Sequence, residues 1–161
     1  MFAQRAFLIQ RLKEKREVVE QLVTKAPSDK EIYAGWAIKE LLAHLSGWDD
    51  AIIEVLGAHA RGEPVSRTVS AGINAYNAKT VHTRETLSLE QVIKEWKATR
   101  ELVFQVLEEL PDEKFNQQLT FPWGEPGTVA YFIEIFVEHE EHHARHLAQW
   151  LENPNQIVGE H

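Results

Sequence analysis

The stretch FVEHEEHHARHLAQW, residues 136–150, carries four of the eight histidines of this 161-residue chain. His139 and His143 are four residues apart, a spacing that on a helix places two side chains on one face, one turn apart. His142 and His146 have the same spacing. Either pair could supply two ligands of a three-histidine metal site, so we asked which pair faces the protein interior.

The apolar residues of this segment predict a helix from about Thr128 to Leu151 and distinguish the two pairs. At 100° per residue, His139 and His143 lie within about 60° of the centre of the apolar stripe. His142 and His146 lie about 80° to 120° from it, further toward solvent. We therefore predict that the first pair points inward. The stripe consists of Val129, Phe132, Phe136, Leu147 and Trp150.

A third histidine lies in a second amphipathic segment, which we expect to be helical from about Tyr33 to His59. His44 falls at the inner edge of its apolar stripe, where it can point into the space between helices. The alternative is a half-buried histidine that binds no metal. Gly47 beside it either admits another segment close to the backbone or is a tolerated glycine. The stripe consists of Ala34, Ala37, Leu41, Leu45, Trp48, Ile52, Val55 and Leu56.

Two further amphipathic segments predict two more long helices. The first runs from Phe2 to about Lys25, with an apolar stripe at Ala6, Ile9, Leu12, Val19, Leu22 and Val23. The other follows Ser88, which forms a capping-box pattern with Gln91, and it ends at Pro111. Its inner face offers no metal ligand. The chain is thus expected to be all-α, a four-helix bundle in a single domain over residues 1–161.

Two connections in this bundle are long. Residues 57–88 are rich in glycine, proline and asparagine, and they predict a crossover between the second and third helices with a short helix near Asn74–Val81. Residues 111–127 are rich in turn formers and contain the aromatic run FPW at 121–123. These aromatic residues either fill the end of the bundle, the interpretation we prefer, or wall a pocket.

Composition restricts the chemistry. The chain has no cysteine, which excludes disulfides, thiolate nucleophiles and iron–sulfur clusters, so any metal must be held by histidine or carboxylate. The net charge of −8 and the lack of a basic stripe argue against nucleic acid as a partner. No apolar run reaches the ~20 residues of a membrane span, and the N-terminal residues lack the apolar region of a signal peptide. We expect a cytoplasmic protein, and on general frequency a homodimer.

Three neutral imidazoles suit a borderline divalent ion, for which we expect Zn²⁺ or Ni²⁺, with Fe²⁺ as an alternative. Three ligands leave a coordination position open, as in catalytic zinc sites. Such a site can polarise a bound group or lower the pKa of a bound water or thiol. Each ligating ring also needs a partner for its second nitrogen, and Glu40 or the glutamates among residues 138–141 are candidates for that role.

Two motifs resemble those of one protein family. WAIKELLAHLSGWD, residues 36–49, is similar to the second-helix motif of the DinB/YfiT-like superfamily, and HEEHHARHLAQ, residues 139–149, resembles its fourth-helix motif. The resemblance covers nearly the whole chain. It implies a four-helix bundle with a divalent-metal site at His44, His139 and His143. Some members of the superfamily are S-transferases or isomerases that use low-molecular-weight thiols such as bacillithiol or mycothiol.

From these observations we expect a metal-dependent S-transferase that acts on a small-molecule substrate together with a low-molecular-weight thiol. Two alternatives remain open at the level of sequence. A metal-activated water would give a hydrolase with the same residues. A bundle that binds a small ligand without catalysis would need no metal chemistry at all.

Overall fold

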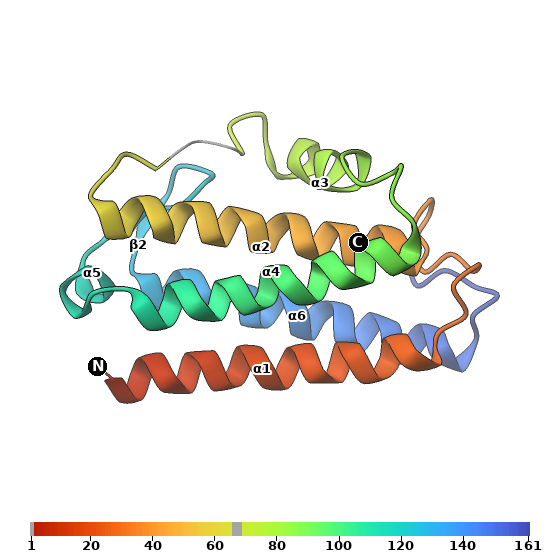
Figure 1. The fold of residues 1–161 in the computed structure, drawn as a ribbon. Helices are drawn as coiled ribbons and strands as arrows, with labels where there is room; N and C mark the ends of the chain where they lie inside the picture. Colours follow the sequence, from red (N-terminus) through yellow and green to blue (C-terminus); the bar gives the residue numbers. More distant parts are fainter. Residues whose placement is uncertain (1, 66–68) are drawn as a thin grey trace.

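The computed structural model describes residues 2–65 and 69–161, with side chains from residue 4 onward. These residues form four long helices that lie side by side (Figure 1), which confirms the all-α four-helix bundle. Helix α1 packs mainly on α6, and α2 mainly on α4. The bounds of the four helices are Phe2–Lys25 for α1, Ile38–Arg61 for α2, Leu89–Glu109 for α4 and Val129–Glu152 for α6. No helix in the described part of the chain has both the length and the apolarity to cross a membrane.

The predicted start of α2 was wrong. The helix begins at Ile38 and not near Tyr33, because residues 32–36 form a tight turn in which the backbones of Tyr33 and Trp36 pair. Gly35 in this turn has φ +79°, a left-handed conformation that favours glycine. Both aromatic side chains of the turn are nevertheless buried. The turn therefore carries Tyr33 into the bundle from outside any helix.

The other helix ends agree closely with the sequence. The Ser88 hydroxyl accepts a hydrogen bond from the backbone N–H of Gln91 at 3.1 Å, and the Gln91 side chain accepts one from the N–H of Ser88 at 2.8 Å. This confirms the capping box of α4. The Thr128 hydroxyl caps α6 in a similar way.

One residue of the apolar stripe predicted for α1 was wrong, because Ala6 is exposed.

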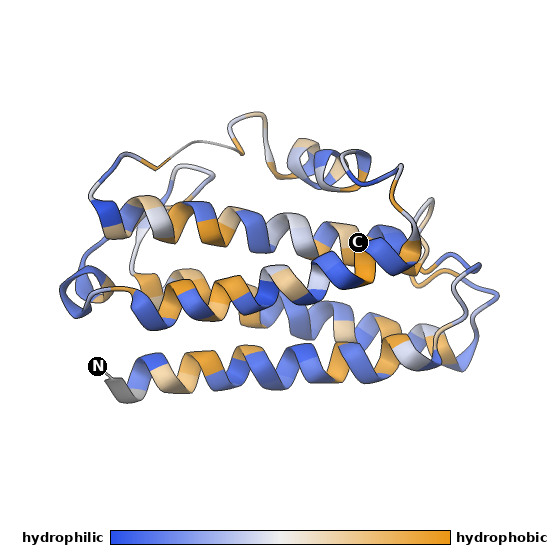
Figure 2. Cartoon of the chain, in the orientation of Figure 1, coloured by the Kyte–Doolittle hydropathy of each residue, from blue (hydrophilic) through white to orange (hydrophobic). Residues whose placement is uncertain are grey.

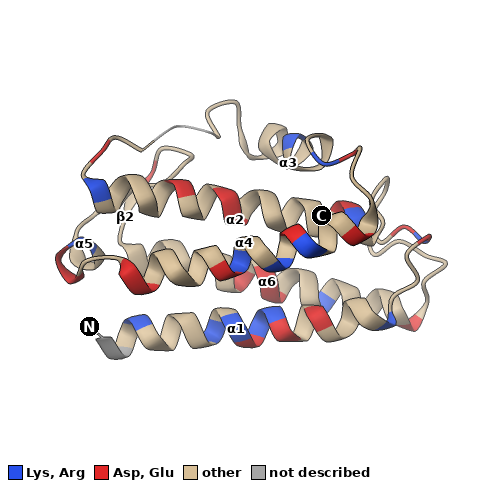
Figure 3. Ribbon diagram, viewed as in Figure 1, with Lys and Arg blue, Asp and Glu red and all other residues tan. Residues whose placement is uncertain are grey.

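The core consists of two apolar clusters separated by a buried polar layer. On α1, for example, Leu12 belongs to one cluster and Val19 to the other, with the buried Arg16 between them. Arg100 on α4 and Glu140 on α6 also stand between residues of the two clusters. The hydropathy colouring in Figure 2 shows the mixed character of each helix, and Figure 3 shows acidic and basic residues interspersed along α1 and α4. The buried polar residues of the layer between the clusters are Arg16, Asp49, Arg100 and Glu140.

The crossover contains helix α3, Ile73–His82, as predicted, and this helix packs against α2, above it in Figure 1. The contact is centred on Gly47. A Cβ atom at Gly47 would lie 2.1 Å from Cγ2 of Thr80, so only glycine allows the two helices to approach this closely. The Tyr76 hydroxyl also donates to the Gly47 carbonyl at 2.6 Å, and the Trp48 indole N–H donates to Oδ1 of Asn77 at 2.8 Å. Gly47 therefore admits a neighbouring segment, the first of the two interpretations.

Replacing this glycine should disturb the docking of α3. Gly47→Ala improves helix propensity by about 1 kcal/mol, but the new methyl group overlaps Thr80 and forces α3 away. We expect a lower midpoint of urea unfolding and faster proteolysis within residues 62–88. Gly57→Ala on the same helix is the control, since its Cβ meets only the flexible end of Arg61 at 3.2 Å and should be neutral or stabilising. Equal behaviour of the two variants would contradict the role of Gly47.

Residues 111–127 form the short helix α5, Asp112–Asn116, and a two-stranded hairpin. Strands β1, Leu119–Thr120, and β2, Pro126–Gly127, pair antiparallel with Leu119 opposite Gly127. Phe121 is buried in the core, as the preferred interpretation predicted. Trp123 is only partly buried and borders a cavity, so the alternative interpretation holds for this residue.

Candidate metal centre

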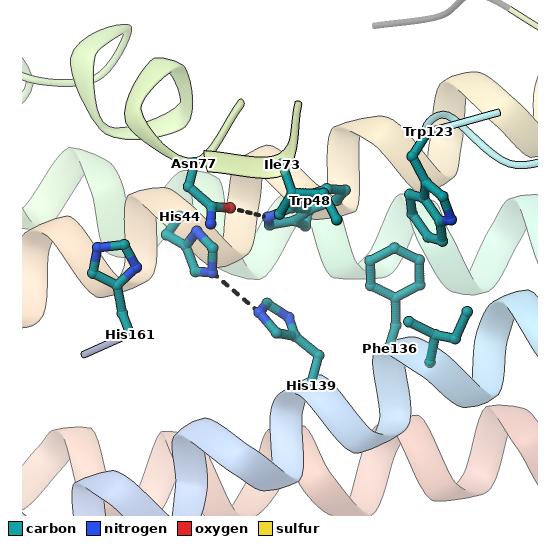
Figure 4. A pocket seen from close by; sticks show the side chains of 9 residues that line it. His44, Trp48, Ile73, Asn77, Trp123, Phe136, His139 and His161 are labelled. Carbon is teal, nitrogen blue, oxygen red and sulfur yellow. Dashed lines mark hydrogen bonds between the residues drawn. The ribbon is translucent and has the colours of Figure 1, made fainter. Parts of the chain in front are cut away.

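The structure brings together the three histidines that the sequence singled out. His44 extends from α2, and His139 and His143 extend from α6. Nε2 of His139 lies 3.1 Å from Nε2 of His44 and 3.1 Å from Nε2 of His143. One nitrogen from each ring lies within 4.8 Å of the other two. Figure 4 shows His44 and His139 pointing toward one another across the space between the two helices.

Hydrogen bonding among the rings does not account for this geometry. A ring nitrogen carries either one proton or one lone pair, so Nε2 of His139 cannot make good hydrogen bonds to two neighbours at once. A single cation between the rings would instead accept the lone pairs of all three ring nitrogens at once. Zinc–nitrogen bonds of about 2.0–2.1 Å in tetrahedral geometry separate two ligand nitrogens by about 3.3 Å, close to the separations found here. The three-histidine group could therefore hold a metal ion.

The protonation state of the three rings suits this role. Burial lowers the pKa of His139 to about 4. Burial also lowers the pKa values of His44 and His143 well below the ordinary value of 6.5, and the neighbouring His139 lowers both further. The neutral imidazole is the form that binds metals. The group is consequently neutral, and free of competing protons, at pH 7.

The ring of His143 is oriented by a residue that the sequence did not indicate. Its Nδ1 lies 2.9 Å from the Tyr33 hydroxyl, which lies 2.7 Å from Nδ1 of His146. Burial raises the pKa of Tyr33, so the phenol keeps its proton. If Nε2 of His143 offers a lone pair, its Nδ1–H donates to Tyr33, whose O–H then donates to His146. This chain of hydrogen bonds is compatible with the tautomer that a metal ligand requires.

Three of the four glutamates named as candidates for this role make other contacts, and the fourth, Glu138, is exposed. The Glu40 carboxylate accepts a hydrogen bond from the N–H of Ala37 at the start of α2, and Glu141 pairs with Lys15 and Arg145. Glu140 lies in the buried polar layer. Sequence spacing could not reveal Tyr33, because it lies 110 residues from His143 and in a turn without periodicity.

Removing the Tyr33 hydroxyl should weaken metal binding. Tyr33→Phe keeps the buried ring but leaves Nδ1 of His143 without its acceptor, and the loss of such outer partners lowers metal affinity about 10–100-fold. Zn²⁺ affinity measured by competition with a chromophoric chelator tests this expectation. Tyr131→Phe, which removes an exposed hydroxyl, is the matched control and should bind Zn²⁺ like the parent protein. Unchanged affinity in Tyr33→Phe would exclude this orienting role.

The buried polar layer lies directly beside the histidines, since Glu140 follows His139 in the chain. Glu140 Oε1 accepts from the guanidinium groups of Arg16 and Arg100, each at 2.6 Å. Asp49 accepts from Arg100 at 2.9 Å and from the Thr99 hydroxyl at 3.0 Å. Burial alone would raise the pKa of Glu140, but the two guanidinium groups outweigh it and lower that pKa to about 2. Glu140 is therefore ionised and paired with both arginines inside the bundle.

Sequence reasoning overlooked this layer although a signal was present. Arg100 stands four residues after Trp96 and three before Val103, in phase with the apolar stripe of α4. Arg16 has the same relation to Leu12 and Val19 on α1. A charged residue in phase with a core stripe needs a buried partner of opposite charge.

A cavity of about 250 Å³ adjoins the histidines. His44 and His139 form part of its wall, and aromatic and aliphatic side chains form most of the remainder (Figure 4). Helix α3 contributes two residues and the hairpin contributes one. The lining residues are His44, Trp48, Ile73, Asn77, Trp123, Ile135, Phe136, His139 and His161.

Without metal, the protein should lose stability as the pH falls below about 6.5. In the unfolded chain histidine titrates near 6.5, whereas the pKa of folded His139 is about 4 and those of His44 and His143 are also lowered. Between these values the unfolded chain binds more protons. Each ring therefore contributes stability that is complete above pH 6.5 and declines by about 1.4 kcal/mol per pH unit below it.

Glu140 affects the stability of the protein in a lower pH range than the histidines do. Its contribution to stability is present above its unfolded pKa of 4.5 and is lost as the pH falls toward 2.

Urea unfolding in EDTA at pH 7.5, 6.0 and 5.0 isolates the effect of the histidines. A free energy of unfolding that stays constant between pH 7.5 and 5.0 would contradict the expectation.

Known proteins share sequence features and the fold with this chain. The sequence profile of the DinB superfamily matches residues 6–147, in agreement with the resemblance of the two histidine motifs. No curated protein matches the sequence. Among solved structures, an uncharacterised protein from Escherichia coli UTI89 is similar over 96% of both chains, with a TM-score of 0.77 and 15% identity.

Two structures of a mycothiol-dependent maleylpyruvate isomerase are also similar, one of them of a mutant. The unmutated isomerase gives a TM-score of 0.77 and 12% identity over 89% of this chain. The mutant gives a TM-score of 0.76 and 11% identity. This chain spans 60% of the isomerase's length. At these identities the likeness establishes the shared bundle fold.

Proposed function

Because the chain belongs to the DinB superfamily, we propose that it is a metal-dependent enzyme that transfers a low-molecular-weight thiol to a small electrophile. In this proposal His44, His139 and His143 hold one divalent transition-metal ion, Zn²⁺ or Ni²⁺, with Fe²⁺ as the alternative. The observation that carries the proposal is the convergence of three neutral ring nitrogens beside a cavity large enough for a substrate.

The residues of the proposed site would have separate roles. The three histidines provide three neutral ligands and leave a coordination position open. A divalent ion bound there would supply a Lewis acid that lowers the pKa of a thiol and favours its thiolate form. Tyr33 keeps the His143 ring in the orientation that directs Nε2 at the site. His44 and His139 also line the cavity, so a molecule bound in it would lie beside the three-histidine group.

Two further observations support a thiol cosubstrate. The chain has no cysteine, so a sulfur nucleophile must come from a second molecule. The isomerase with the similar fold depends on mycothiol, as its name states. The alternative functions are a metal-dependent hydrolase, which would use the same three histidines, and a bundle that binds a small ligand without catalysis.

The test supplies protein loaded with Zn²⁺ or Ni²⁺ with bacillithiol or mycothiol and 1-chloro-2,4-dinitrobenzene. The sulfur forms a bond to the ring carbon, chloride leaves with the bonding electrons, and the thiol proton passes to solvent. We expect turnover that requires the metal and one of the thiols and that His44→Ala abolishes. Metal-dependent hydrolysis of activated esters without thiol would instead identify a hydrolase, and no turnover in either assay would favour the binding protein.

A further inference from the structure

We propose that His161, carried by the segment of residues 153–161 that follows α6, is a displaceable fourth ligand of the metal ion at the three-histidine group. Its imidazole occupies the coordination position that the three helical histidines leave open, and a thiol displaces it to bind there. This inference rests on the metal site of the proposed function and adds the residue that controls access to that site. It follows from the place of His161 in the cavity, from the contacts that hold its segment, and from the chemistry of its ring.

His161 lines the same cavity as two members of the three-histidine group, His44 and His139. Its ring centroid lies 6.3 Å from that of His44. The centroids of His139 and His143 lie 5.0 Å and 5.2 Å from the same ring. In the view of Figure 4, His161 stands beside His44 at the end of the cavity away from Trp123. His161 therefore stands just outside the group of three, and a short shift of its ring would bring it to an ion held there.

An indole ring supports His161 beside the group. The rings of His161 and Trp36 are stacked, with centroids 3.6 Å apart and an angle of 5° between their planes. The same indole contacts the ring of His44, with centroids 5.0 Å apart. Trp36 is buried, so it gives both imidazoles a fixed platform. A stacked imidazole keeps its two nitrogens at the ring edge, where they are free to bind a metal.

The segment that carries this histidine is attached to the bundle at Val158. The backbone N–H of Val158 donates to the carbonyl of Ile32 at 2.9 Å, and its side chain packs against the apolar cluster that contains Ile32. At the end of α6, the Trp150 indole N–H donates to the carbonyl of Glu31 at 2.9 Å. Three extended residues span roughly 10 Å. Residues 159–161 can therefore carry the ring to the metal while Val158 stays in place.

The nitrogens of His161 are available for a metal. Within the described part of the chain, no group makes a hydrogen bond to its ring. Four ligands close a tetrahedral zinc site, whereas three protein ligands leave a position for water or substrate. Because His161 comes from a segment outside the helices, an exogenous ligand can displace it while the helical histidines stay in place. It adds to the three helical ligands and does not replace any of them.

Two binding measurements with opposite expected signs test the proposal. His161→Phe should lower the affinity for Zn²⁺ by at least about 10-fold, the smallest effect usual for the loss of an outer partner of a ligand. Competition with a chromophoric chelator measures this change. The same variant should bind azide at least about 10-fold more tightly when loaded with Co²⁺, because azide no longer competes with the imidazole for the open position. The visible absorption of the Co²⁺ protein follows this binding.

The choice of phenylalanine separates metal binding from packing. His161→Phe keeps an aromatic ring against Trp36 and removes only the two nitrogens. His82→Phe is the matched control, because the His82 side chain is 75% exposed and lies on α3 outside the cavity lining. This control should leave both affinities unchanged.

Either of two results overturns the proposal. In the first, His161→Phe binds both Zn²⁺ and azide like the parent protein. In the second, its affinities for Zn²⁺ and azide fall together, which would mean that His161 supports the shape of the site without binding the metal.

The outcome can be separated from that of the proposed function. Opposite changes in the two affinities without thiol conjugation in the parent protein would refute the transferase and leave His161 as a metal ligand. Metal- and thiol-dependent conjugation in the parent protein, with unchanged affinities in His161→Phe, would refute the role of His161 alone.

Discussion

Asp49→Ala is expected to lower the free energy of unfolding by about 3–5 kcal/mol, the usual effect of breaking a buried ion pair from one side. Asp49 is 1% exposed, and its carboxylate contacts both Arg16 and Arg100. Without it, two buried guanidinium groups share only Glu140. The uncompensated charge in the low-dielectric interior, and not the lost packing, causes most of the destabilisation.

Urea unfolding at pH 7.5 measures this effect, and the neighbouring residue provides its control. Asp50 stands next in the chain and also pairs with an arginine, Arg84, but its side chain is 51% exposed. Asp50→Ala should therefore lower the free energy of unfolding by about 1 kcal/mol or less. Equal decreases in the free energy of unfolding of the two variants would mean that burial does not increase the contribution of an ion pair to stability.

His139→Ala is expected to lower the affinity for Zn²⁺ by more than about 100-fold, exceeding the 10–100-fold effect of losing an outer partner. Nε2 of His139 is the nitrogen that lies 3.1 Å from each of the other two rings, so its loss removes the centre of the group. The remaining His44 and His143 could offer only two ligands, which is too few for a stable zinc site.

His142→Ala is the matched control, because it removes a histidine from the same turn of α6 that does not belong to the group. Its Zn²⁺ affinity should stay within a few-fold of the parent protein. Metal content is best measured on protein purified without a histidine tag. Parent-like metal content in both His44→Ala and His139→Ala would show that the proposed site does not exist.

The repeat of apolar residues along each helix was enough to predict most of the fold. Periodicity is a local property, and it fixes which face of a helix turns inward whatever the partner. For this reason the bounds of α1 and α6 were correct, and the capping box at Ser88 was correct because it too is a local pattern. The same reasoning separated His139 and His143 from His142 and His146, and the structure places the first pair together with His44.

The start of α2 is a feature that apolar periodicity did not predict correctly. Ala34 and Ala37 continue the apolar stripe of this helix toward the N-terminus, yet Ala34 is exposed in a turn that Gly35 makes possible. The aromatic residues of the turn are buried because Tyr33 contacts His143 and His146 of α6 and Trp36 stacks on His161, and no periodic signal encodes such contacts. The same turn supplies the Tyr33 hydroxyl to His143, so the error in the helix boundary and the missed partner have one cause.

The sequence by itself determined four amphipathic helices and the inward direction of three histidines, because both depend on spacing along a single helix. Only the tertiary structure decided which residues meet between helices. It placed Thr80 over Gly47, enclosed Asp49 and Glu140 with two arginines, and set Trp123 at the edge of the cavity. These contacts depend on how separate elements pack, which is set by the summed shape and charge of all the faces involved and by no local pattern.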